Sequence, residues 1–306
     1  MKKRTKNFLI CTFFIFLIGI VLTNNSLVKT SVVSSFDLWL KKVFPSLFPM
    51  FIISDILIKL GFATTLAKIF TKISSKLFKV NGLASYVMIM SMLSGTPSNA
   101  IFIRDLYDNN YLSTNDASKI LCFTFFPNPL FLYTFLLLIF KDITIALKII
   151  AVCYLGNLFI GILLRNFYPE ETLLIKEIKQ ENNNFPKVLT ESIKKSMNNM
   201  LMILGTITFF ILMSSLVTHV LDLTDLNSTI LRGVLELTNG LNDLIVLNSN
   251  TFIKIILSGI FISFGGFSIH MQVKSVLGDT LISYKLFLLA RTVHIIITTI
   301  ILFLLF

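Results

Sequence analysis

The chain is a series of long apolar runs separated by short polar stretches. A helix needs about 20 apolar residues to cross a bilayer. The runs that predict such helices lie at 8–23, 43–60, 117–140, 143–165, 197–220 and 285–306. Pro45 and Pro49 stand near the start of the second run and predict an irregular beginning to that helix. Pro127-Asn128-Pro129 interrupts the third run.

Two further apolar runs are too short to cross a bilayer and lead into helix-breaking residues. Residues 83–93 lead into Ser94-Gly95-Thr96-Pro97-Ser98-Asn99, and residues 251–262 lead into Ser263-Phe264-Gly265-Gly266-Phe267-Ser268. Within lipid, the backbone groups freed by such breaks must be buried in protein or line a wet cavity. Both segments therefore predict broken-helix hairpins that enter the membrane and return.

The two broken segments align without gaps at an offset of 170 residues, which pairs Gly95 with Gly265 and Ser98 with Ser268. Three predicted crossings separate them, and an odd number makes the hairpins enter from opposite sides, as in inverted-repeat transporters. We therefore expect an all-α, polytopic helical membrane protein with an inverted repeat of broken-helix hairpins. Lys274, Lys285 and Arg291 do not suit an outside hairpin. Either they line an internal path, or the second hairpin is a full crossing.

Composition supports a membrane protein. Hydrophobic residues make up 55% of the 306 residues and charged residues only 14%, and the mean hydropathy is +0.82. A water-soluble fold could not hide so much apolar surface, which excludes a soluble enzyme, a disordered chain and a secreted disulfide scaffold. Cys11, Cys122 and Cys153 lie inside apolar runs without CxxC spacing, so we interpret them as packing residues.

The net charge of +11 is interpreted as a topological signal, because basic residues collect on the cytoplasmic side of membrane proteins. The basic residues among 2–6 predict a cytoplasmic N-terminus and an uncleaved anchor, with a signal peptide as the alternative. Residues 64–80 carry Lys68, Lys72 and Lys76 at steps of four beside an apolar stripe, which is typical of a helix on an anionic membrane surface. We expect 166–196 to be cytoplasmic and 221–250 to lie outside.

These signals predict four parts of the chain. Residues 1–42 would form an N-terminal membrane anchor and an outside loop, and residues 43–165 a first membrane repeat. Residues 166–196 would form a cytoplasmic loop of mixed charge, and residues 197–306 a second membrane repeat.

Several polar residues stand at predicted membrane depth, where they are costly and often functional. Glu236 lies in an otherwise uncharged run and is either a cation or solute ligand or a solvated loop carboxylate. His270 follows the Gly-Gly break and either meets a polar solute or is satisfied in a packed interface. Asn128 either contacts a solute or bonds carbonyls freed at a plain kink. Arg291 either pairs with Glu236 or extends towards the membrane surface.

The predicted substrate-binding residues are Ser94, Gly95, Thr96, Ser98, Asn99, Asn128, Glu236, Thr238, Asn239, Ser263, Gly265, Gly266, Ser268, His270, Gln272 and Arg291. There is no nucleotide-binding loop, HExxH motif or GxSxG motif, so we expect no enzyme, no catalytic residue, no metal site and no cofactor. The expected partners are the lipid bilayer, a small polar solute and a coupling cation. Nucleic acid is not an expected partner, and an oligomer is compatible with the sequence.

A set of short motifs in fixed order resembles the YlbJ-type sporulation integral membrane proteins of the nucleoside-recognition, or Gate domain, family. The motifs are Val43-Phe44-Pro45-Ser46-Leu47-Phe48-Pro49, Ser94-Gly95-Thr96-Pro97, Asn128-Pro129-Leu130-Phe131, Glu236-Leu237-Thr238-Asn239-Gly240, Ser263 to Gln272, and Phe287 to Arg291 with His294. The resemblance implies a multi-pass inner-membrane protein of endospore-forming bacteria that is required for spore formation. Family members tend to have Tyr where Thr96 stands.

Two functions fit these observations. The first is a transporter-like protein for a small polar solute, which the family label extends to a nucleoside-like one. The second is a non-transporting membrane scaffold or sporulation factor that acts on protein partners through the 166–196 loop.

Overall fold

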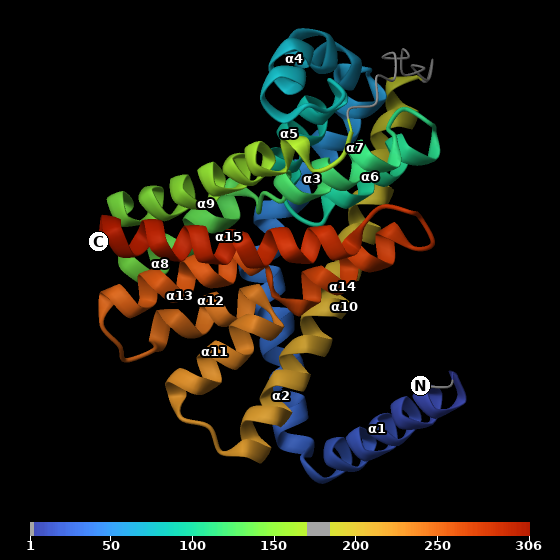
Figure 1. Ribbon diagram of the computed structural model, residues 1–306. Coiled ribbons are helices and arrows are strands. Elements are labelled where there is room, and N and C mark those ends of the chain that lie inside the picture. Colours follow the sequence, from blue (N-terminus) through green and yellow to red (C-terminus); the bar gives the residue numbers. More distant parts are fainter. Residues whose placement is uncertain (1–2, 170–183) are drawn as a thin grey trace.

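The computed structural model describes residues 3–169 and 184–306, and these residues form helices without any strand (Figure 1). The helices are α1 (Lys3–Thr23), α2 (Asn25–Leu38), α3 (Phe44–Lys59), α4 (Phe62–Phe78), α5 (Leu83–Ser94), α6 (Ser98–Asp108), α7 (Thr114–Phe123), α8 (Pro129–Phe140), α9 (Ile143–Leu163), α10 (Phe185–Leu221), α11 (Asp225–Leu235), α12 (Leu237–Val246), α13 (Thr251–Phe264), α14 (Gly266–Leu277) and α15 (Tyr284–Leu305). A π-helix, η1, spans Trp39–Val43, and a 3-10 turn, η2, spans Leu164–Asn166.

Within the described residues, four helical stretches are long and apolar enough to cross a membrane. They are Ile143–Asn166, Phe185–Leu221, Thr251–Leu277 and Tyr284–Leu305. The pair Thr65–Phe78 and Leu83–Ser94 passes the same test together but is bent by 98°. The chain is therefore an all-α, multi-pass membrane protein.

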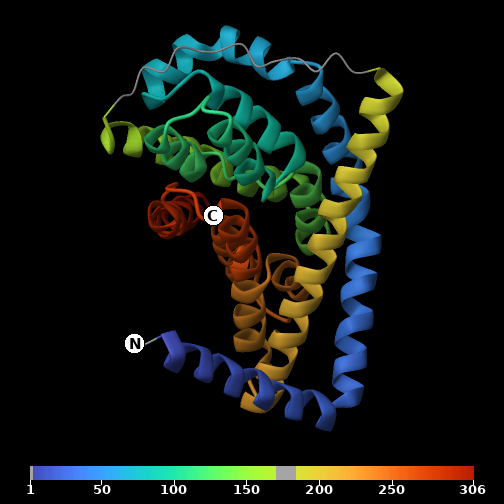
Figure 2. The same cartoon turned by 90° about the vertical axis from the view of Figure 1, so that its right-hand side faces the viewer.

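The second apolar run, 43–60, begins with an irregular helix, as expected from its prolines. Helices α2, η1 and α3 follow one another in a single rod that lies beside α10 (Figure 2). The π-helix ends at Val43, just before Pro45. Because proline lacks an N–H and clashes with the carbonyl four residues earlier, a locally wider helix relieves the crowding. The Trp39 indole donates a hydrogen bond of 3.1 Å to the Met200 carbonyl of α10.

The molecule contains two copies of one arrangement: a hairpin, a broken span and a continuous span. The first copy is α5–α6, α7–α8 and α9, and the second is α11–α12, α13–α14 and α15. The two broken spans start alike, with side-chain caps from Ser113 and Asn250 on the third residue of each helix. The copies pack reciprocally, because α6 of the first contacts α14 of the second while α12 of the second contacts α8 of the first.

This arrangement corrects the predicted repeat. The sequence alignment paired the first hairpin with residues 251–274, but those residues lie within the 27-residue stretch Thr251–Leu277, which is a span rather than a hairpin. A single residue, Gly265, separates α13 from α14, so the chain continues in nearly one direction. The true counterpart of the first hairpin is α11–α12, with its break at Glu236.

With α7–α8 counted as a crossing beside α9 and α10, three crossings separate the hairpins, so the corrected repeat is still predicted to be inverted. It also accounts for the basic residues that did not suit an outside hairpin. Lys274 and Lys285 now flank the 278–283 link, which lies on the same face as the base of the first hairpin: Arg104 donates to the Leu277 carbonyl (2.8 Å), and the Ser283 N–H donates to Ser118 (2.9 Å). We call this the basic face, comprising residues 79–82, 109–113, 164–168, 278–283 and the start of α10. The opposite, or far, face carries residues 141–142, 222–224, 247–250 and the C-terminus (Figure 1).

Helix α4 has the features expected of a membrane-surface helix. Leu66, Ala67 and Phe78 are buried against the protein, whereas Ile69 and Ile73 are exposed. Lys68, Lys72 and Lys76 are also exposed, so an apolar stripe and a basic stripe share the outer surface. Which face is cytoplasmic stays a prediction.

Two predicted boundaries move. Residues 25–42 form α2 and most of η1 rather than an outside loop, and α1 lies apart from the helical bundle (Figures 1 and 2). In the 166–196 segment, α10 already begins at Phe185, so Lys187, Glu191 and Lys195 belong to its first turns. Residues 170–183 of that predicted loop lie outside the described residues.

Candidate functional site

The two hairpin tips and the two broken spans meet around one cavity, the central pocket, of about 50 Å³. Its polar lining comes from Thr96 at the first tip, Asn128 at the first break, Glu236 and Thr238 at the second tip, and Ser268 and Gln272 on α14. Its apolar walls include Val43, Leu47, Phe131, Ile203 and Ile207. Residues far apart in sequence therefore form one site between the two repeats.

The first hairpin tip is docked on the break between α7 and α8. Gly95 has a φ of +81°, and a Cβ there would lie 2.9 Å from the backbone N of Asn128. Only glycine tolerates both this positive φ and the close approach of the Asn128 backbone. Asn128 donates from Nδ2 to the Leu93 carbonyl at 2.7 Å, and its Oδ1 accepts from the Phe131 N–H at 3.1 Å. Asn128 thus caps α8 and holds the tip of the hairpin.

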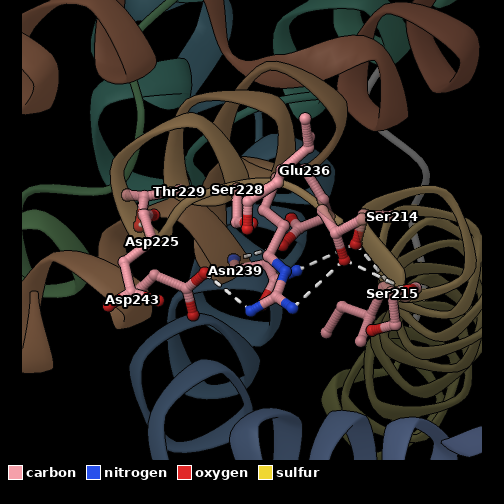
Figure 3. A network of polar contacts seen from close by, with 12 residues as sticks. Ser214, Ser215, Asp225, Ser228, Thr229, Glu236, Asn239 and Asp243 are labelled. Carbon is pink, nitrogen blue, oxygen red and sulfur yellow. Dashed lines mark hydrogen bonds and ion pairs between the residues drawn. The ribbon is translucent and has the colours of Figure 1, made fainter. Parts of the chain in front are cut away.

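The second hairpin tip is docked on the other broken span in the same way. Gly266 has a φ of +76°, and a Cβ there would lie 2.9 Å from the backbone N of Leu237. Glu236 caps α12 by accepting from the Asn239 N–H at 2.6 Å, and Asn239 donates from Nδ2 to Ser214 of α10 at 3.1 Å (Figure 3). Glu236 is 2% exposed. It is therefore placed beside the breaks and not in bulk solvent.

The central pocket has one acidic side chain in its lining, Glu236. It is the one ionisable side chain among the lining residues, and the ion pairs found among the described residues do not include it. The remaining polar lining consists of hydroxyl and amide groups. Such a lining favours a hydrogen-bonding solute and disfavours an anion.

The backbone carbonyls freed at the first break are satisfied by side chains of α9 and α15. Tyr154 donates to the Pro127 carbonyl at 2.5 Å, and Asn157 donates to the Phe125 carbonyl at 2.7 Å. These donors meet the requirement that backbone polar groups at membrane depth find protein partners. Tyr154 and Asn157 are not among the site residues predicted from the sequence. Their spacing of three residues inside an apolar span is a signal that could have revealed them.

Arg291 neither pairs with Glu236 nor extends to the membrane surface, in contrast to both expectations. It is fully buried and does not line the central pocket. Its guanidinium donates to the Cys122 carbonyl at 2.5 Å and to Asn157 Oδ1 at 2.8 Å, and it lies 3.4 Å from the Ser263 carbonyl. Cys122 and Ser263 stand at the C-terminal ends of α7 and α13, where the helix dipoles are negative. A fixed cation thus ties the two broken spans together.

His270 is satisfied in a packed interface, which was the alternative to a ligand role. Its ring nitrogens lie 3.0 Å from the Tyr284 hydroxyl and 3.1 Å from the Phe264 carbonyl. The ring stacks on Phe264 and does not line the central pocket. His294 is held similarly, 3.0 Å from the Cys153 carbonyl.

The other predicted site residues lie around the central pocket and not on its lining. Ser94 and Ser98 line two neighbouring cavities, and Asn239 supports Glu236. Asn99 is fully buried, and its amide nitrogen and oxygen have no hydrogen-bond partner among the described residues. Ser263 contributes its carbonyl to Arg291, and Gly265 turns the chain against the Phe125 ring. No cluster of metal-binding side chains occurs in the described part of the chain.

The amino-acid sequence is similar to that of one characterised membrane protein. The chain is 27% identical over 327 residues to the "Sporulation integral membrane protein YlbJ" of Bacillus subtilis (strain 168), an alignment that covers 94% of this chain and 80% of the relative. The chain is similar to YlbJ. This similarity supports the YlbJ-type resemblance seen in the motifs. No protein-family model and no solved structure matches the chain, and the Gate domain assignment stays an expectation.

Proposed function

We propose that this chain is a cell-membrane protein that acts in spore formation by moving a small polar solute through the central pocket. The role in spore formation follows from the similarity to YlbJ over most of the chain. The observation that supports transport is the construction of the pocket, because both hairpin tips and both broken spans contribute to it. Transporters of several folds place substrate sites where discontinuous helices of inverted repeats meet.

The lining supports one class of solute. Glu236 is the only ionisable side chain among the described lining residues, and Asn128, Gln272, Thr96, Thr238 and Ser268 offer hydrogen bonds. A solute that carries a hydroxyl or amide group fits this lining, either uncharged or with a single positive charge. A carboxylate or phosphate would lie beside Glu236 without a compensating cation. Nucleosides fall within the permitted class and are the first solutes to test.

The central pocket must enlarge to bind a solute of the size of a nucleoside. Its volume of about 50 Å³ holds a few water molecules, whereas sites for drug-sized ligands occupy roughly 300–1,000 Å³. The hairpins are held at the breaks mainly by Asn128 and by contacts at two glycines. Separation of one tip from its break would open the pocket to one side of the membrane. In the structure we describe, both tips are docked on their breaks.

Glu236→Gln tests the proposal. Gln keeps an oxygen that can cap α12 but removes the charge, so we expect normal expression and insertion with loss of spore formation. Untargeted metabolite uptake into proteoliposomes should show a solute taken up by the wild-type chain and not by the variant. Asp279→Asn, at an exposed position on the basic face, is the matched control and should behave as wild type.

Deletion of 170–183 separates transport from the scaffold hypothesis. If the deletion abolishes spore formation while Glu236→Gln preserves it, the chain acts through its loop and the transport proposal fails.

A further inference from the structure

Two further cavities continue from the central pocket towards the basic face. The first, of about 90 Å³, shares Ile203 and Gln272 with the central pocket. The second, of about 20 Å³, shares Ser98 and Asn199 with the first. Shared lining residues make the three cavities neighbours in a row between hairpin α5–α6 on one side and helices α3 and α10 on the other.

The row contains polar groups that lack protein partners. Ser54 lines the outermost cavity, is 1% exposed, and its hydroxyl has no hydrogen-bond partner among the described residues. An unpaired buried hydroxyl costs about 1–3 kcal/mol on the scale of protein mutations. The first turn of α6, at Pro97 and Ser98, faces the same cavities, and a helix N-terminus presents N–H groups and a partial positive charge. These groups are suited to a solute that accepts and donates hydrogen bonds.

An ion pair marks the outer end of the row. Lys195 Nζ lies 3.0 Å from Asp55 Oδ1, and Lys59 Nζ lies 3.1 Å from Asp55 Oδ2. Asp55 is buried, whereas the Lys195 side chain is 42% exposed. The outermost cavity is therefore open at Lys195, in the third turn of α10.

The opposite side of the central pocket is closed by direct contacts. Asn239 joins the Glu236 cap to Ser214 of α10 (Figure 3). Beyond it, Arg232 pairs with Asp243 at 3.1 Å and donates to Thr218 at 3.3 Å. A polar vestibule of about 540 Å³ on the far face, lined by Thr218, Arg232 and Asp243, lies behind this network and shares no lining residue with the central pocket.

We propose that the row of cavities is a solute corridor, with a second polar site at Ser54, Ser98 and Asn199, that connects the central pocket to the basic face and passes small uncharged hydrogen-bonding molecules. The inference rests on the proposed function and narrows its solute class. Glu236 disfavours anions in the pocket, and the α6 N-terminus disfavours cations in the corridor, where the charges of Lys195 and Asp55 compensate each other. A solute that passes both the acidic pocket and the positive end of α6 is therefore expected to be uncharged.

Thiol labelling tests the corridor without knowledge of the solute. The background is the full chain in vesicles with Cys11, Cys122 and Cys153 replaced by alanine. The first reporter is Ser98→Cys in the corridor, and the control is Ser258→Cys, equally buried but outside the cavities described above. The probes are methanethiosulfonates with a neutral methyl, a cationic aminoethyl or an anionic sulfonatoethyl group.

We expect the neutral probe to label Ser98→Cys, with the cationic probe about tenfold slower, the scale of a charge beside a partly buried helix end. Ser258→Cys should stay unlabelled. The second reporter is Thr96→Cys in the central pocket. Asn199→Trp should fill the corridor and slow labelling of Thr96→Cys from the basic face by about tenfold or more, as expected for a substitution that overfills a packed cavity. Labelling of Val246→Cys, exposed on the far face, should not change.

Two results would overturn the corridor: a Ser98→Cys that is as inert as Ser258→Cys, or labelling of Thr96→Cys that Asn199→Trp does not slow. Failure of the proposed function looks different. In that case the labelling pattern is as expected while proteoliposomes take up no solute. Conversely, uptake without labelling places the route elsewhere and leaves the proposed function intact.

Discussion

Gly266→Ala is predicted to destabilise the protein and to abolish solute uptake, because Gly266 is the point at which the second hairpin tip meets α14. Its φ of +76° lies in the left-handed region, which costs a residue with a Cβ about 1–2 kcal/mol. The added methyl group would lie 2.9 Å from the backbone N of Leu237. Overfilling a packed site of this kind costs about 1–3 kcal/mol. The two effects together predict a loss of about 2–5 kcal/mol.

The atom that the new methyl group meets belongs to the backbone of the tip, so no side chain can rotate away. The tip that carries Glu236 must move, and the central pocket changes shape. Thermal unfolding of the purified protein in detergent measures the stability loss. At about 2–4 °C per kcal/mol for a domain of 150–250 residues, the midpoint should fall by at least roughly 4 °C.

Gly205→Ala is the matched control. Gly205 lies in the middle of α10, and a Cβ there would have no atom within 4 Å. Alanine is a better helix former than glycine by about 1 kcal/mol, so this variant should be as stable as wild type or more stable. An unfolding midpoint for Gly266→Ala that is no lower than that of Gly205→Ala would refute the docking of the tip on α14.

Three further predictions follow from the contacts of the breaks and from the topology. Asn128→Leu removes both the Leu93 bond and the α8 cap, and should lower the unfolding midpoint more than Asn128→Asp, which keeps the capping oxygen; equal midpoints would argue against the cap. Arg291→Met leaves buried carbonyls unpaired at about 1–3 kcal/mol each, so size-exclusion chromatography should show less folded protein; a wild-type profile would mean that the breaks do not need the cation. Cysteine in place of exposed Lys285 should be labelled by impermeant reagents only from the cytoplasm, and cysteine in place of Val246 only from outside. Labelling of both from one side would exclude the inverted topology.

Much of the fold was accessible from the sequence because lipid imposes strong local rules. A span must be long and apolar, and a break at membrane depth must contain residues that end a helix. The continuous spans α9 and α15, the tip at Gly95 and the break at Asn128 could therefore be predicted from local composition. So could the polar residues that line the central pocket, since Glu236 and Gln272 stand out against apolar neighbours.

The second hairpin, α11–α12, could not be predicted from these local composition rules. Helices α11 and α12 have 11 and 10 residues and carry several polar side chains, so neither resembles a span. Hydropathy detects long apolar segments and gives little signal for a short polar hairpin. The repeat was then aligned on glycines, whereas the structure distinguishes a hairpin tip at Gly95 from a nearly straight break at Gly265.

Local composition is enough to predict a multi-pass helical membrane protein, the breaks at Gly95, Asn128 and Gly265, and the polar residues that stand at membrane depth. The break at Glu236, and which break faces which, depend on how the helices pack. The tertiary structure placed Arg291 at the ends of α7 and α13, where Cys122 and Ser263 offer carbonyls from segments that are distant in sequence. It also separated His270, which is satisfied by its neighbours, from Glu236, which lines the pocket. The physical reason is that the partners of a buried polar group are contributed by other helices, and their identity is fixed only when those helices pack.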